Sequence, residues 1–162
     1  MNVKKHKVRL WLFAALTLLV MIAIVWFSAQ NAELSQQMSD GFLASLIGRF
    51  LDAVLPGLTG QGMQVDIRKY AHMCEFMALG VCAFLYASER RLWRRDLRAA
   101  LLAFAFSLFY ACTDEFHQIF VPGRACRAFD VMVDGIGIAL GVCFCRLLQR
   151  LAQGKAPKSE AS

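Results

Sequence analysis

Residues 114–134 read DEFHQIFVPGRACRAFDVMVD, a polar stretch that lies between two strongly apolar runs. Its side chains recur at helical spacing, since Gln118 follows Asp114 by four residues and Asp134 follows Asp130 by four. The spacing predicts that one helix ends and another begins here, on either side of a turn at Pro122. Ionisable groups at the edge of an apolar run are costly to keep there, so we interpret the stretch as a candidate functional site rather than a solvated loop.

Composition identifies the class of protein. The chain has 162 residues, of which 58% are apolar and only 19% charged, which is typical of a small membrane bundle rather than a soluble domain. The net charge of +6 does not indicate a nucleic-acid partner, because the basic residues flank apolar runs and no nucleic-acid-binding motif is present. The six cysteines form no CxxC pair, so we interpret them as small apolar side chains.

Four apolar runs are candidates for membrane-spanning helices. The first, Leu10–Phe27, carries no charge and is long enough to cross a bilayer. A cleaved signal peptide is the alternative, but SAQNA is a poor cleavage site, which favours an uncleaved anchor. The second predicted span is Tyr70–Ser88. The third begins at Leu97 or Ala99 and runs to Cys112, a short run that can extend at either end, and the fourth has Val131–Cys145 as its core. In the fourth run, Gly137 and Gly141 form a GxxxG pattern, which permits close packing against another helix.

Apolar residues at 38–54 repeat every three or four positions, which predicts an amphipathic helix on the membrane surface or capping the bundle. The expected fold is therefore an all-α integral membrane bundle of four transmembrane helices, with an amphipathic interfacial helix between spans 1 and 2. Residues 1–150 form the membrane domain in this prediction, and residues 151–162 form a polar cytoplasmic tail.

The distribution of Lys and Arg predicts the orientation. Thirteen of the eighteen basic residues fall in the head, the middle turn and the tail, which share one side in a four-span bundle. They are Lys4, Lys5, Lys7, Arg9, Arg90, Arg91, Arg94, Arg95, Arg98, Arg146, Arg150, Lys155 and Lys158. Loops rich in Lys and Arg stay in the cytoplasm, so we expect both chain ends inside and the 114–134 stretch outside.

This orientation places three separate polar groups at the same outer level, and predicts a pocket open to the outer leaflet. The candidate catalytic residues are His72, Glu75, Asp114, Glu115, His117, Gln118 and Asp130. The candidate substrate-binding residues are Lys69, Arg124 and Asp134.

At these residues the chain resembles the VanZ-like family of bacterial membrane proteins. The resemblance rests on KYAHMCEF at 69–76, DEFHQIFVPGR at 114–124, and Asp130 followed by VDGIG at 133–137. The polar WFSAQNAELS at 26–35 also resembles the serine-containing segment of the family. The resemblance implies a multi-span protein of the cytoplasmic membrane, in a family whose namesake is associated with low-level teicoplanin resistance. The segment ACRAF at 125–129 is bulkier and more basic than the family pattern, which bears on the shape of the substrate.

The leading hypothesis is an enzyme that acts on a lipid headgroup or a lipid-linked cell-envelope precursor. His72 or His117 would serve as general base, with Glu75, Asp114 or Glu115 orienting the ring. Arg124 would hold a phosphate, and Asp130 would fix Arg124.

Two other functions stay open. One is a non-catalytic binder of a phosphate-bearing lipid or an amphiphilic glycopeptide. The other is a transporter, which is disfavoured because the third and fourth spans lack charge toward the midplane. A metal held by Asp114, Glu115, His117 and His72 is conceivable, but their spacing matches no established metal motif, so the sequence assigns no metal ligands.

Overall fold

The computed structural model of the protein describes residues 3–30, 67–90, 96–122, 124 and 126–154. These residues form four long helices, α1 (Val3–Ser28), α4 (Ile67–Glu89), α5 (Asp96–Gln118) and α6 (Ala128–Gly154). Each contains a segment long and apolar enough to cross a membrane, with mean hydropathies of 2.6, 1.3, 1.3 and 2.0 in chain order. The predicted all-α bundle of four membrane spans is therefore confirmed. The predicted interfacial helix at 38–54 lies outside the described residues, as do residues 155–162 of the predicted tail.

All four helices extend beyond their apolar runs. The third run was predicted to be extendable at either end, and α5 does continue past Cys112 to Gln118, so that it includes the first acidic residues of the polar stretch. The helix can continue because the side chains of Asp114 and Gln118 find hydrogen-bond partners inside the bundle. Helix α6 runs from Ala128 to Gly154, which carries it without interruption across the predicted domain boundary at residue 150.

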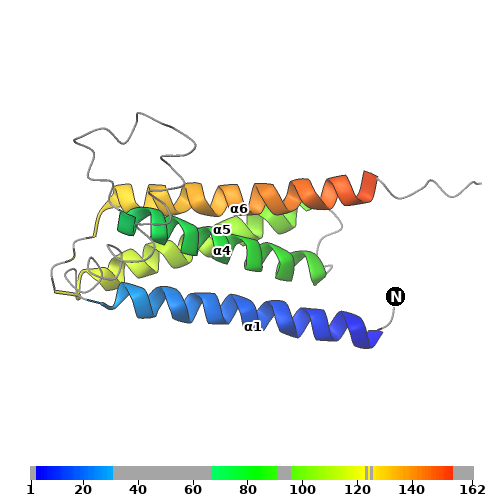
Figure 1. Ribbon diagram of the computed structural model, residues 1–162, viewed down its shortest axis with the longest axis horizontal. Coiled ribbons are helices and arrows are strands. Elements are labelled where there is room, and N and C mark those ends of the chain that lie inside the picture. Colours follow the sequence, from blue (N-terminus) through cyan, green and yellow to red (C-terminus); the bar gives the residue numbers. More distant parts are fainter. Residues whose placement is uncertain (1–2, 31–66, 91–95, 123, 125, 155–162) are drawn as a thin grey trace, which may run out of the picture.

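The helices alternate in direction (Figure 1). Helices α1 and α5 end on the left of the view, where α4 and α6 begin, and we call this the polar end because buried polar residues gather there. They are Ser28, Asp114, Glu115, Gln118 and Asp134. We call the opposite end, where α1 begins and α6 finishes, the basic end. The described basic residues toward it are Lys4, Lys5, Lys7, Arg9, Arg90, Arg98, Arg146 and Arg150.

Helix α4 is central, since it packs against α1, α5 and α6. Its approach to α6 depends on glycine. A Cβ atom on Gly137 would overlap the carbonyl oxygen of Met73, and one on Gly141 would lie 2.5 Å from that of Met77. The GxxxG pattern in α6 thus allows the two backbones to touch, as the sequence predicted.

The apolar side chains divide into a narrow core and a wide exterior. Phe76, Leu79 and Phe84 of α4 are fully buried, together with Ile24 and Ile138 from the helices on either side. Many other large apolar side chains point outward, and they are spread over all four helices. In water such a surface would drive aggregation, so this exterior fits a bundle surrounded by lipid.

Helix α1 touches α5 much less than it touches α4. Between these three helices lies a mainly apolar cavity of about 410 Å³, lined by residues that include Leu18, Tyr86, Arg90 and Phe106. The cavity lies toward the basic end, whereas at the polar end α1, α4 and α5 are joined by hydrogen-bonded side chains.

Candidate functional site

Asp114 is the centre of the polar end. The Oδ2 atom of this carboxylate, which is 3% exposed, accepts hydrogen bonds from Ser28 Oγ at 2.9 Å and from Gln118 Nε2 at 2.9 Å. It also lies 3.1 Å from Nε2 of His72. These partners come from α1, α5 and α4, so one carboxylate joins three helices. A buried carboxylate is tolerated only when it is bonded in this way.

His72 lies between two acids on the central helix. Its Nδ1 atom is 3.0 Å from Glu75 Oε2, one turn further along α4, while its Nε2 faces Asp114. The edge of Phe76 packs against the ring at 5.2 Å between centroids. A neutral imidazole carries one N–H group and can donate to only one of the two carboxylates, whereas an imidazolium donates to both. The side chains of His72 and Glu75 are 15% and 24% exposed, so this pair forms the accessible edge of the network.

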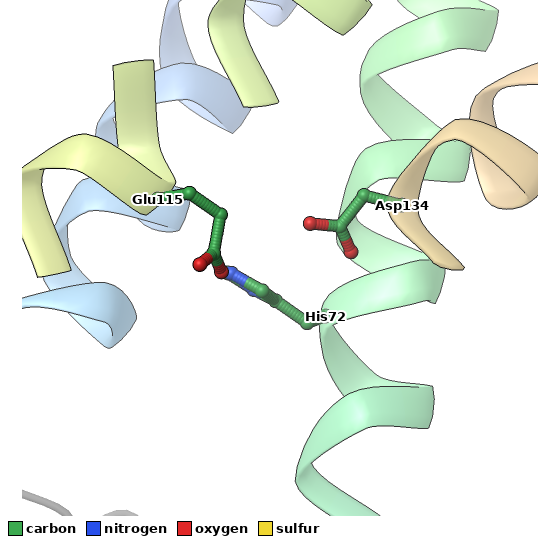
Figure 2. Close-up of side chains that lie close together, drawn as sticks. All are labelled: His72, Glu115 and Asp134. Carbon is green, nitrogen blue, oxygen red and sulfur yellow. The ribbon is translucent and has the colours of Figure 1, made fainter. Parts of the chain in front are cut away.

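Two further acids lie beside the imidazole. Glu115 and Asp134 are each 2% exposed, and each has an oxygen atom within 4.8 Å of the other and of a His72 ring nitrogen. Figure 2 shows the three side chains converging from α5, α6 and α4. Glu115 accepts a hydrogen bond from the backbone N–H of Arg127 at 3.0 Å. Asp134 Oδ2, in contrast, is buried and has no hydrogen-bond partner among the described residues.

The connection between α5 and α6 returns to cap α1. Arg124 donates from Nε to the carbonyl of Gln30 and from Nη2 to that of Phe27, both at 3.1 Å. The last carbonyl groups of a helix have no partner within it and carry partial negative charge, so a guanidinium is well suited to this position. The contact holds the end of α1, and with it Ser28, against the site.

Comparison with known proteins identifies the family. A model of the VanZ/LLP1 family matches residues 13–149, which is most of the chain and includes every residue of the polar end described above. The chain belongs to the VanZ/LLP1 family. No curated protein and no solved structure matches it. The chemistry available to this VanZ/LLP1 protein must therefore be derived from its own side chains.

The structure brings together six of the residues that the sequence singled out, although the roles given to them stay predictions. They are His72, Glu75, Asp114, Glu115, Gln118 and Asp134.

The remaining candidates differ in their positions, and one of them, Asp130, lies close enough to Glu115 and Asp134 to interact with both electrostatically. His117, the alternative general base, has an exposed side chain that makes no hydrogen bond to any described residue. Asp130 is half-buried in the first turn of α6. Lys69 belongs to α4, but its side chain lies outside the described part of the structure.

One residue of the VanZ/LLP1 site was missed. Ser28 is fully buried and donates to Asp114, yet no sequence pattern had assigned it an individual role. Two signals were available: it directly follows the uncharged run of the first span, and it lies in the segment that resembles the family's serine-containing stretch. What the sequence lacked was the position of α1 beside the end of α5.

Acidic groups outnumber cations around His72 among the described side chains. The carboxyl groups of Glu75, Asp114, Glu115 and Asp134 all lie around a single imidazole. When buried carboxylates outnumber their cationic partners, the excess negative charge must be neutralised by protons or by a bound cation. The site can therefore exchange protons, and it also offers oxygen and nitrogen ligands on one small surface.

Proposed function

We propose that this VanZ/LLP1 protein acts on the phosphate-bearing headgroup of a membrane lipid or lipid-linked cell-envelope precursor at the outer leaflet. The observation that carries the proposal is the position of His72. Its ring is bracketed by Glu75 and Asp114, and it lies at the accessible edge of a network that is otherwise buried. Titratable groups that are buried and clustered in this way are typical of functional sites.

The outer location follows from charge. The basic end holds Lys and Arg from the start of α1, from Arg90 directly after α4, from Arg98 at the start of α5 and from the end of α6, whereas the polar end has Arg124 and Arg127 among its described side chains. By the positive-inside rule we place the basic end and both termini in the cytoplasm of a bacterial cell. The polar end then lies at the outer face of the inner membrane, at the level of lipid headgroups.

The roles of the side chains follow from their contacts. In its neutral form, His72 accepts a proton from a hydroxyl or water bound at the accessible edge, and Asp114 then stabilises the imidazolium. Ser28 and Gln118 fix the orientation of Asp114 through bonds of 2.9 Å each. Arg124, half-buried at the rim, attracts the phosphate while two of its N–H groups hold α1.

A non-catalytic binder is the second candidate, and one observation favours it. Both ring nitrogens of His72 already face carboxylates of the same chain, at 3.0 and 3.1 Å. An imidazolium that donates a hydrogen bond to each carboxylate holds the helices in place and presents positive charge, but it accepts no proton. In this function the headgroup of the lipid, or of an amphiphilic glycopeptide, is recognised and released unchanged.

The test uses the full-length protein in nanodiscs, incubated with extracted bacterial envelope lipids and analysed by mass spectrometry. His72→Ala is the decisive variant, and His117→Ala is its matched control because it removes an exposed imidazole near the same end of the bundle. A new lipid species formed by the wild type and the control, but not by His72→Ala, supports catalysis. Lipid that co-purifies unchanged with the same dependence on His72 supports the binder. If the wild type neither retains nor converts any lipid, the proposal is overturned.

A further inference from the structure

Three side chains at the polar end have the arrangement of a metal site. His72, Glu115 and Asp134 come from three different helices, and one ligand atom of each lies within 4.8 Å of the other two. Ligands bound at about 2.0–2.2 Å to one ion lie roughly 3–4 Å from one another, so a small rotation of these side chains is enough to hold a cation. Figure 2 shows all three directed into the same space.

A second observation points to a missing positive charge at this place. Asp134 is 98% buried, because only 2% of its surface is exposed, and its Oδ2 atom has no hydrogen-bond partner among the described residues. Its carboxyl group points toward His72 and Glu115 (Figure 2). The Oδ1 atom of Asp114, next to the same imidazole, is also buried and without a hydrogen-bond partner in the described structure. Buried carboxylate oxygens left in this state require a proton or a cation.

The surroundings of His72 fit a metal ligand. Histidines that bind metals almost always donate the other ring N–H to a carboxylate or carbonyl group, which fixes the ring and strengthens the ligand. Glu75 is placed to accept from Nδ1 at 3.0 Å, which leaves Nε2 directed toward the acids. Glu115 is held in position by the backbone N–H of Arg127. Both ligands are thus oriented by neighbours that do not themselves need to bind the ion.

We propose that His72 Nε2, Glu115 and Asp134 bind a first-row divalent transition-metal cation such as Zn²⁺ or Mn²⁺ at the polar end, with Asp114 as a further oxygen ligand. One imidazole and several carboxylates favour such ions over Ca²⁺ and Mg²⁺, which prefer oxygen ligands alone. None of the described cysteines belongs to this group, so the proposed site has nitrogen and oxygen ligands and no thiolate. With the ion bound, Nε2 of His72 is a ligand and its Nδ1–H is donated to Glu75, so the ring holds the ion instead of acting as general base. The inference thus goes beyond the proposed lipid function and rests on these side chains alone.

The experiment measures metal in the absence of lipid substrate. The full-length protein, purified in detergent without a histidine tag, is stripped with chelator, dialysed against Zn²⁺, Mn²⁺ or Co²⁺, and analysed by elemental mass spectrometry. The absorption spectrum of the Co²⁺ form reports ligation directly. We expect about one ion per chain in the wild type and a loss of at least roughly tenfold in affinity for Glu115→Gln and Asp134→Asn. Glu75→Gln is expected to weaken binding by about 10–100-fold while keeping the ion's spectrum.

The variants are chosen so that unfolding does not imitate loss of metal. Asp134→Asn keeps the shape of the side chain and removes a buried charge that has no hydrogen-bond partner at Oδ2, so this variant should be at least as heat-stable as the metal-free wild type. His117→Ala removes an exposed imidazole and should bind metal like the wild type. The proposal is overturned if the wild type holds no more metal than Asp134→Asn, or if His117→Ala loses metal to the same extent. Because no lipid substrate is added in this experiment, either result overturns the metal site without bearing on the lipid function, which the nanodisc experiment tests separately.

Discussion

The two ends of the bundle both join helices through charged side chains, but in opposite ways. At the basic end, Arg9 of α1 pairs with Glu89 of α4 at 2.8 Å, and the arginine side chain is 55% exposed. At the polar end, Asp114 is almost fully buried and receives its bonds from inside the bundle. An exposed pair is inexpensive and easily replaced, whereas buried acids require desolvation that packed apolar residues avoid. The polar end is thus kept at a cost to stability, which indicates that it serves a function.

The largest expected effect comes from removing the centre of the polar end. Asp114→Ala leaves Ser28, Gln118 and His72 with buried groups facing no acceptor, so we expect a loss of about 3–5 kcal/mol in the free energy of unfolding. Unfolding in mixed micelles with increasing SDS measures it.

Asp114→Asn is the control, because its amide oxygen still accepts from Ser28 and Gln118. It should lose clearly less stability than Asp114→Ala. If Asp114→Ala lowers the free energy of unfolding by less than about 1 kcal/mol, the charged contacts at the two ends contribute equally to stability, and the contrast drawn between them is wrong.

A smaller effect is expected from separating α4 and α6 near the polar end. Gly137→Ala places a methyl group against the backbone carbonyl of Met73, one residue from His72, so we expect a loss of about 1–3 kcal/mol. Gly135→Ala is the matched control on the same helix, since its added methyl group would meet only Leu108 Cδ1, at 3.5 Å. The control should be neutral or slightly stabilising because alanine favours helix. Equal losses in both variants would show that the close approach of the helices is not the cause.

The smallest effect is expected at the basic end. Arg9→Ala removes a pair whose arginine is 55% exposed, although the side chain of Glu89 is only 13% exposed, and should cost about 0.2–1 kcal/mol. The same unfolding measurement, repeated at low and high salt, should show the difference from wild type shrinking as salt screens the pair. A loss that matched Asp114→Ala and did not respond to salt would mean that the two ends contribute alike.

Much of the fold could be predicted from local pattern. The four spans follow from uncharged runs of sufficient length, and the glycine spacing predicts a close helix contact. Pairs within one helix could also be predicted from the sequence: His72 and Glu75 at i,i+3 lie 3.0 Å apart, and Gln118 donates a hydrogen bond to Asp114 at i,i+4.

Contacts between helices could not be predicted from the sequence, because they depend on the rotation of each helix about its own axis. His117 and Gln118 both lie within one turn of Asp114, yet only Gln118 faces the bundle and His117 is exposed. The same limit explains why Ser28 received no role and why no metal ligands were assigned. His72, Glu115 and Asp134 lie on three helices and form no local motif, so only the packed bundle brings them together.

The contacts of α1 also set an order of assembly. This helix is synthesised before the other three, and its polar partners at Glu89, Asp114 and Arg124 follow much later in the chain. Because membrane helices insert separately and associate afterwards, α1 can pack against α4 once the second span has been inserted, whereas its bonds to Asp114 and Arg124 form only after the third span and the turn beyond it have emerged. A chain truncated before Arg124 would keep the packing of α1 on α4 but would leave the last carbonyl groups of α1 without their guanidinium.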